Sequence, residues 1–179
     1  MTELMYFDND CLSAFLWVKA EQLLVQMYPG KIVVPQQVYN EISLVPHLKA
    51  QLDAHVSNSN IAIPAIEIDS AEYKLYNKLA YTPDSDHSII GKGEAAVIAL
   101  ASVKKGIVAS NNLKDIATYV EELNLKHTTT PIILADAFNR SIITEADGNN
   151  LWSAMLAKKR KLGSASFSDY LAEHSKRKE

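Results

Sequence analysis

In the segment Leu4-Met5-Tyr6-Phe7-Asp8-Asn9-Asp10, a short apolar run is followed directly by three polar residues. Four apolar residues have the length of a buried strand, and any of the three polar residues can cap a following helix. This part of the sequence therefore predicts a β-strand that leads directly into a helix, which is the first half of a βαβ unit.

Strand and helix patterns alternate along the rest of the chain. From Cys11 to Tyr28 apolar residues recur at three- and four-residue steps, which predicts one amphipathic helix that Pro29-Gly30 ends. The other predicted strands are Ile32–Val34, an extended stretch Ile61–Ile68, Ile107–Ala109 and the polar run Thr128–Thr130. The other predicted helices are Pro35–Ile42, Pro46–Val56, one from the cap Ser70 to Ala80, Glu94–Lys104, Asn112–Leu123, one that begins at Pro131, Thr144–Leu162 and Phe167–His174. Gly106 is expected to end the helix Glu94–Lys104, and a loop is predicted over Tyr81–Gly93.

Alternating strands and helices predict parallel pairing through right-handed crossovers. The expected fold class is α/β, a three-layer α/β/α sandwich around a mostly parallel central sheet. The chain has 179 residues, 47% of them hydrophobic and 22% charged, with no linker long enough to divide it. We therefore expect one domain over residues 1–179, with a core at about 4–140 and a C-terminal helical extension at about 141–179.

Composition narrows the class of protein. The longest apolar run, Ala95–Ala101, is far too short to span a membrane, and the N-terminus has no basic region typical of a secretory signal. The single cysteine, Cys11, cannot form an internal disulfide and is predicted to be a buried core thiol. These features predict a soluble, cytoplasmic protein without a membrane partner.

Charge is distributed unevenly. The net charge is −3, but residues 151–179 hold seven Lys and Arg against three Asp and Glu, whereas residues 1–150 hold eleven against eighteen. A basic end on an acidic body could let a polyanion approach an acidic site. The basic run Lys158–Lys161 falls within a predicted helix, where four consecutive residues surround a full turn, so a solvated basic turn is the favoured interpretation.

Four acidic side chains are candidates for one site at the carboxyl ends of the strands, where open parallel sheets bind ligands. Asp8 follows the first strand, Glu41 and Glu94 lie on helices that follow sheet crossovers, and Asp115 follows the strand Ile107–Ala109. Each acid taken alone has a purely structural explanation. Asp8 can cap a helix, Glu94 and Asp115 can interact favourably with a helix dipole, and Glu41 can lie on a solvent-exposed helix face. Taken together they predict a cation between them, and oxygen ligands favour Mg²⁺ or Mn²⁺ over zinc.

Other catalytic classes lack their sequence signatures. The segment Gly91-Lys92-Gly93-Glu94 does not have the spacing of a phosphate-binding P-loop, and no G-x-S-x-G segment provides a serine nucleophile. The first strand is followed by Asp8 and Asn9 rather than by glycines, which argues against a dinucleotide site.

Four segments of the sequence, each with an acidic residue, match known motifs in order and spacing. Asp8-Asn9-Asp10-Cys11-Leu12 resembles the opening motif D-[ST]-[NSD]-x-[LI], and Val34-Pro35-Gln36-Gln37-Val38-Tyr39-Asn40-Glu41 resembles V-P-x-x-V-x-x-E. The third segment, Gly93-Glu94-Ala95-Ala96-Val97-Ile98-Ala99-Leu100-Ala101, is closest to G-E-A-x-x-I-A-L-A. The fourth, Ile107-Val108-Ala109-Ser110-Asn111-Asn112-Leu113-Lys114-Asp115, resembles a strand followed by T-x-D-x-x-[DF]. Together the four segments resemble the motifs of the PIN-domain nucleases, and the third is closest to one subgroup of that family.

The resemblance implies a PIN-like fold and a Mg²⁺- or Mn²⁺-dependent endoribonuclease acting on RNA, in a family that includes many toxins of bacterial toxin–antitoxin pairs. An antitoxin partner and a homodimer are among its implications. The near-invariant acids of the family correspond to Asp8, Glu41 and Glu94. Asn112 stands where the family usually has Asp, so Asp115 is the candidate fourth catalytic and metal-binding residue.

Three polar residues are further candidates for the site, namely Asn9, which replaces the usual Thr or Ser, Ser110 and Asn112. Because amide oxygens are poorer metal ligands than carboxylates, Asn112 raises an alternative. In that alternative the chain is a catalytically weakened PIN-like module that recognises RNA or a protein partner.

Overall fold

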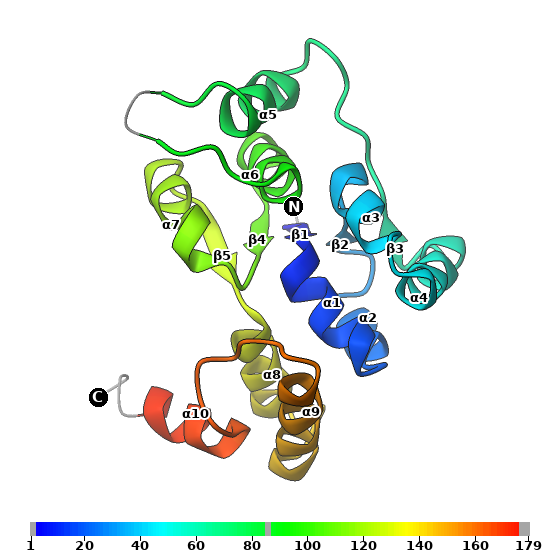
Figure 1. Ribbon diagram of the computed structural model, residues 1–179. Helices are drawn as coiled ribbons and strands as arrows, with labels where there is room; N and C mark the ends of the chain where they lie inside the picture. Colours follow the sequence, from blue (N-terminus) through cyan, green and yellow to red (C-terminus); the bar gives the residue numbers. More distant parts are fainter. Residues whose placement is uncertain (1–2, 85–86, 176–179) are drawn as a thin grey trace.

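A five-stranded, all-parallel sheet forms the centre of the computed structural model, which describes residues 3–84 and 87–175 (Figure 1). The strand order is β3-β2-β1-β4-β5. The strands are β1 (Met5–Phe7), β2 (Ile32–Val33), β3 (Ile61–Ala62), β4 (Ile107–Ala109) and β5 (Lys126–Thr128). The predicted parallel α/β architecture is therefore confirmed.

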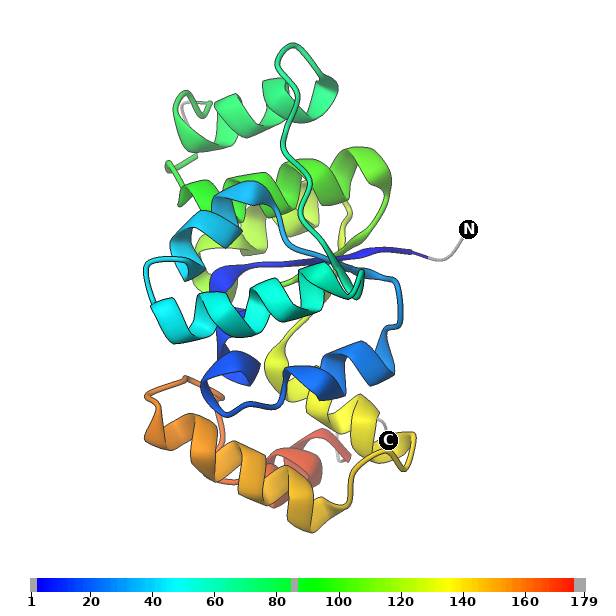
Figure 2. The same cartoon turned by 90° about the vertical axis from the view of Figure 1, so that its right-hand side faces the viewer.

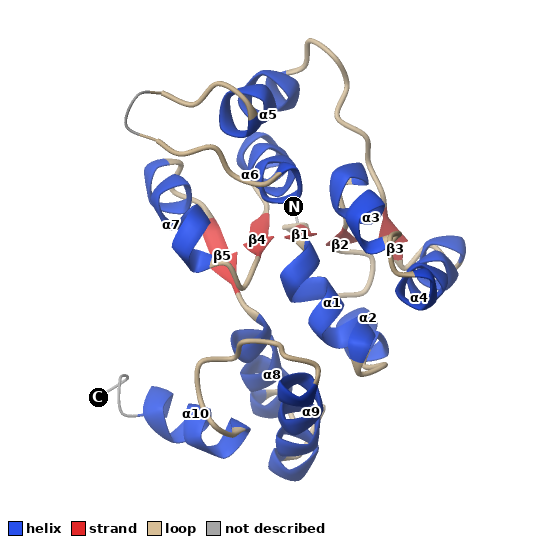
Figure 3. Cartoon of the chain, in the orientation of Figure 1, coloured by secondary structure: helices blue, strands red, loops and turns tan. Residues whose placement is uncertain are grey.

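Helices cover both faces of this sheet, as Figure 3 shows with strands in red and helices in blue. The helices are α1 (Asn9–Trp17), α2 (Glu21–Met27), α3 (Gln36–Ile42), α4 (Pro46–Ser57), α5 (Ala71–Ala80), α6 (Lys92–Lys104), α7 (Leu113–Glu122), α8 (Thr130–Asn139), α9 (Glu145–Ala157) and α10 (Phe167–Ser175). In Figure 2, α5, α6 and α7 lie above the sheet, and α1, α2 and α8 lie below it, with α9 and α10 beyond them. This is the expected three-layer sandwich.

The other strands lie on both sides of the central strand β1. The chain first adds β2 and β3 on one side of β1, and later adds β4 and β5 on the other. Right-handed crossovers in opposite directions place their helices on opposite faces of a sheet. The connections that follow β1 and β4 therefore diverge, and open parallel sheets usually bind ligands where two such neighbouring strands end.

The core is built from the strands and from the inner faces of these helices. Phe7 in β1, Val108 in β4 and Leu12 in α1 are fully buried. The predicted core thiol Cys11 is fully buried as well and accepts a hydrogen bond from Thr130 Oγ1 at 3.6 Å. Within the described ranges, no helix combines the length and the apolar character needed to cross a membrane.

The prediction of a single helix over Cys11–Tyr28 is wrong, because this segment forms two helices, α1 and α2. Lys19 adopts a left-handed conformation with φ of 56°. The backbone N–H of Ala20 donates to Phe15 O at 2.9 Å and that of Lys19 donates to Leu16 O at 3.2 Å. This pair of bonds is a Schellman motif, which ends a helix even without the usual glycine.

The segment around α6 also differs from its prediction. The helix begins at Lys92, before Glu94, and its left-handed terminal residue is Lys105, with φ of 56°, rather than Gly106. Gly106 is required for another reason, because a Cβ there would collide with the ring of Tyr6 and with Leu4 O. In the predicted loop Tyr81–Gly93, positions 85 and 86 lie outside the described residues.

Three other predicted boundaries move. The extended stretch predicted at Ile61–Ile68 pairs only at Ile61–Ala62, since Pro64 has no N–H to donate to a neighbouring strand. The predicted strand Thr128–Thr130 shifts to Lys126–Thr128, and Thr129 instead caps α8 by accepting from Ile132 N at 3.3 Å. The helix predicted to end at Leu162 ends at Ala157.

Candidate active site

Strand register places the first candidate, Asp8, beside Ser110. Phe7 in β1 pairs with Ala109 in β4, and the backbone N–H of Asp8 donates to Ala109 O at 2.9 Å. Asp8 and Ser110, the residues that follow these two strands, therefore leave the sheet side by side. There the hydroxyl of Ser110 donates a short hydrogen bond to Asp8 Oδ2.

Asp8 is both a helix cap and a buried carboxylate. Its Oδ1 accepts from the backbone N–H of Cys11 at 2.8 Å, which caps α1, and its exposure is only 2%. Burial raises its pKa from 3.8 to about 7, against the opposing hydrogen bonds from Ser110 and Cys11, and nearby Asp10 and Glu94 raise it further. Capping alone explains Asp8's hydrogen bond to Cys11, but not an acid buried among other acids.

Glu41 projects from the second turn of α3 and is held from two sides. Its Oε2 accepts from Asn9 Nδ2 at 3.3 Å, and its Oε1 accepts from the backbone N–H of Gly93 at 3.1 Å. A Cβ at Gly93 would lie 2.7 Å from Glu41 Oε1, so only glycine leaves room for this approach. Burial raises the pKa of Glu41, and the charges of Glu94 and Asp10 add to the shift.

Glu94 and Asp115 are joined by Asn112. The Nδ2 amide of Asn112 donates to Glu94 Oε1 at 2.8 Å and to Asp115 Oδ2 at 2.7 Å, and its backbone N–H donates to Ser110 Oγ at 3.2 Å. Glu94 lies in the first turn of α6 and is partly buried, whereas Asp115 is exposed in the first turn of α7. Asp115 is therefore linked to the other acids through Asn112.

The electrostatic environment of these acids is uncompensated. The negative charges of Asp10 and Glu94 raise the pKa values of Asp8 and Glu41. Among residues 3–84 and 87–175, no Lys, Arg or His forms an ion pair with any of them or with Asp115. A bound cation would relieve this repulsion.

The donor set fits a hard divalent cation by its chemistry, because every candidate ligand is an oxygen atom. The positions of these oxygen atoms match a metal site less well. In the described part of the chain, no three His, Cys, Asp or Glu side chains form a ready-made metal site. Glu41 and Glu94 are instead held by hydrogen bonds from Asn9, Gly93 and Asn112.

Two residues close to these acids, Asp10 and Asn111, were not among the predicted site residues. Asp10 does not cap α1, because Asp8 does, and its charge acts on both Asp8 and Glu41. Asn111 clamps the start of α8, since its Oδ1 accepts from Thr130 N at 2.8 Å and its Nδ2 donates to Thr130 Oγ1 at 2.9 Å. The signal for Asn111 was its place directly after a buried strand, beside Ser110 and Asn112.

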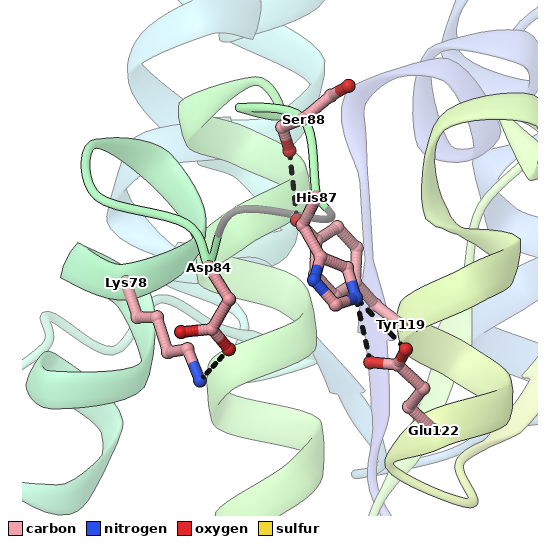
Figure 4. Close-up of polar contacts among 6 residues, drawn as sticks. All are labelled: Lys78, Asp84, His87, Ser88, Tyr119 and Glu122. Carbon is pink, nitrogen blue, oxygen red and sulfur yellow. Dashed lines mark hydrogen bonds and ion pairs between the residues drawn. The ribbon is translucent and has the colours of Figure 1, made fainter.

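The segment that leads into Glu94 is fastened to α5 and α7 (Figure 4). His87 Nε2 lies 2.9 Å from both carboxylate oxygens of Glu122, and its ring stacks on Tyr119 with centroids 5.0 Å apart. The Tyr119 hydroxyl donates to Ser88 O at 2.9 Å, and Lys78 pairs with Asp84 at 2.5 Å. These contacts fix the approach to the Gly91–Gly93 turn and hence the start of α6.

Comparison with known proteins identifies the family. No curated protein gives a significant match to the sequence. The sequence profile of a PIN-domain family, in contrast, matches residues 5–176, which is nearly the whole chain and includes α9 and α10. With this match added to the parallel sheet and the four acidic segments, the chain belongs to the PIN-domain family.

Proposed function

We propose that the protein is a metal-dependent endoribonuclease that hydrolyses RNA phosphodiester bonds at the acidic cluster of Asp8, Glu41, Glu94 and Asp115. PIN-domain proteins are generally nucleases, and they generally use divalent metal ions. The observation that carries the proposal is a group of acids at the switch point of the sheet, in which the charge of Glu94 acts on both Asp8 and Glu41. Among the described residues, no basic side chain forms an ion pair with these acids. Acids grouped in this way repel one another unless a cation lies between them.

Asp8, Glu41 and Glu94 would hold the ion, with Asp115 and Asn112 at its border. A Mg²⁺ or Mn²⁺ ion supplies Lewis-acid stabilisation of the phosphate charge and lowers the pKa of bound water. The protein contributes orientation. The Cys11 N–H and the Ser110 hydroxyl fix the Asp8 carboxylate, and the Gly93 N–H fixes that of Glu41.

Metal-dependent cleavage of labelled single-stranded RNA tests the proposal. Protein stripped with EDTA should be inactive, and Mn²⁺ or Mg²⁺ should restore cleavage. Asp8→Asn and Glu94→Gln should each lower the rate by about 100-fold or more, the scale for losing a preorganised electrostatic group. Glu67→Gln, at an exposed carboxylate on the segment before α5, is the matched control and should keep full activity. Unchanged cleavage in both site variants would show that another site or a contaminant is responsible.

One observation favours a second candidate, a catalytically weakened module that recognises RNA or a protein partner. Asn112 stands at the fourth acidic position, and its amide donates to Glu94 where a metal ion would need that carboxylate free. Calorimetry with Mn²⁺ separates the candidates. A binding isotherm that Asp8→Asn abolishes supports the nuclease, and no measurable binding together with no turnover supports the recognition module.

Two partners follow from the resemblance to toxin nucleases rather than from the fold. One is an antitoxin protein, which a short neighbouring reading frame encoding a DNA-binding protein would support. The other is a second copy of the chain, since homodimers are implied by the resemblance. Light scattering after size-exclusion chromatography, with and without a co-expressed candidate antitoxin, measures both.

A further inference from the structure

The basic run Lys158–Lys161 does not lie on a helix, contrary to the sequence-based expectation. Helix α9 ends at Ala157, and Lys159 is left-handed with φ of 59°. The backbone N–H of Arg160 donates to Met155 O at 3.0 Å and that of Lys159 donates to Leu156 O at 2.8 Å. This Schellman turn directs the chain away from the helix axis, so the four charges are no longer spread around a helical turn.

The run packs against α1, the helix that Asp8 caps. Lys158 Nζ lies 5.7 Å from the centroid of the Trp17 ring, and Arg160 Nη1 donates to Ser13 Oγ at 3.5 Å. Arg160 Nε also donates to Lys158 O at 3.1 Å, which holds the turn together. Figure 2 shows the loop after α9 (orange) on the side of the molecule where β1 ends.

A cleft of about 350 Å³ separates this run from the acidic cluster. Asp10, Asn111 and Asn112 line one wall, and Lys159, Arg160 and Lys161 line the other. Lys159 and Lys161 are exposed, and within the described ranges neither pairs with a carboxylate. The two ammonium groups therefore share a cleft with Asn112, whose amide donates to Glu94.

We propose that Lys159, Arg160 and Lys161 form a binding site for backbone phosphates of single-stranded RNA, next to the bond presented to the acidic cluster. Lys and Arg bind phosphate through charge-assisted hydrogen bonds. The basic wall attracts the chain that the acidic body repels. The proposal rests on the proposed function, to which it adds the residues that position the substrate.

The salt dependence of RNA binding tests this site without requiring turnover. Fluorescence anisotropy with a labelled single-stranded RNA in Mg²⁺ is measured in the Asp8→Asn background, where the RNA stays intact. Lys159→Gln with Lys161→Gln leaves the structural contacts of Arg160 in place. Each phosphate contact contributes about 0.7 to the slope of log affinity against log salt, so this double variant should be shallower by roughly 1.4. Affinity in low salt should fall by about tenfold or more.

The matched control is Lys74→Gln with Lys105→Gln, which removes the same charge. Lys74 lies on α5 and Lys105 at the far end of α6 from Glu94, and both are exposed. A slope that changes only in the 159/161 variant supports the site. Equal losses in both double variants, an unchanged slope, or no RNA binding by the parent would each overturn it. Cleavage by the wild type together with an unchanged slope would reject the site while leaving the nuclease proposal intact.

Discussion

Asn112 donates a hydrogen bond from its Nδ2 to Glu94 Oε1 at 2.8 Å. The same amide group reaches Asp115 Oδ2 at 2.7 Å, so one neutral side chain bridges two carboxylates. In the absence of a metal this bridge reduces the repulsion between the acids, because each N–H replaces part of the positive charge that an ion would supply. Asn112 therefore links Glu94 to Asp115 and stabilises this part of the cluster.

Asn112→Asp should favour metal binding. The new carboxylate cannot donate to Glu94 or Asp115 and adds a like charge, so without metal the free energy of unfolding should fall by about 1–2 kcal/mol. With Mn²⁺ the affinity should rise by about tenfold, because an anionic oxygen replaces an amide. Thermal denaturation in EDTA and titration calorimetry measure the two effects. Asn150→Asp, the same change at an exposed position of α9, is the control. Unchanged or weaker Mn²⁺ binding in Asn112→Asp would place the metal elsewhere.

Gly93→Ala should impair the site while leaving the fold intact. The new Cβ would lie 2.7 Å from Glu41 Oε1 and 3.0 Å from Oε2, so the flexible carboxylate must move away from the Gly93 N–H. Alanine is otherwise favourable in a helix, so the melting temperature should change little. We expect Mn²⁺ affinity and cleavage to fall by about tenfold, a typical effect of displacing one positioned ligand.

A double-mutant cycle shows whether this effect passes through Glu41. Gly93→Ala combined with Glu41→Gln should be no worse than Glu41→Gln alone, because both changes remove the same carboxylate contact. Additive losses would mean that Gly93 acts through the backbone of α6 rather than through Glu41.

Much of the fold could be predicted from local patterns, because strands such as Ile107–Ala109 are short, apolar and followed by polar residues. Helix ends were less predictable. Lys19, Lys105 and Lys159 all adopt left-handed conformations where sequence rules expect glycine, so the breaks after α1 and α9 carried no local signal.

The missed end of α9 had the largest consequence for the site. A helix through Lys161 spreads the basic run around its axis, whereas the observed turn places three of its side chains on one wall of a cleft. Long-range contacts such as Asn9 with Glu41, which are 32 residues apart, depend on the packing of α1 against α3 and cannot be obtained from spacing alone. In contrast, Asp8 beside Ser110 follows from parallel register once β1 and β4 are neighbours.

Tyr119→Phe should loosen the segment that leads into Glu94. The hydroxyl of Tyr119 donates to Ser88 O, and losing one such bond costs about 1 kcal/mol. For a chain of this size the melting temperature should fall by about 2–4 °C. Hydrogen exchange should accelerate in residues 87–91, while the stacking of the ring on His87 is kept. Glu122→Gln, which weakens a half-exposed pair with His87, should have a smaller effect of about 0.5 kcal/mol. Exchange rates in 87–91 that stay at the wild-type level in Tyr119→Phe would show that this contact does not hold the segment.

Asp8→Asn should stabilise the metal-free protein at neutral and higher pH. Burial raises the pKa of Asp8 from 3.8 to about 7 in the folded protein, so between these values the folded state retains a proton that the unfolded chain releases. The stabilisation that results is complete below the unfolded-state pKa and is lost as pH rises through about 7. Asparagine can still cap α1 and carries no charge, so the variant escapes this loss.

In EDTA the stability of Asp8→Asn should exceed that of the wild type by an amount on the order of 2 kcal/mol above pH ~7.5, and the difference should disappear near pH ~4. Urea denaturation across this pH range measures it, with Glu67→Gln as the control for the loss of one exposed carboxylate. Adding Mn²⁺ should reverse the order at neutral pH, because the ion stabilises only the protein that keeps the Asp8 carboxylate. A wild type that is as stable as Asp8→Asn at pH ~8 without metal would mean that the buried carboxylate is already compensated, and the acidic cluster would then have no need of a cation.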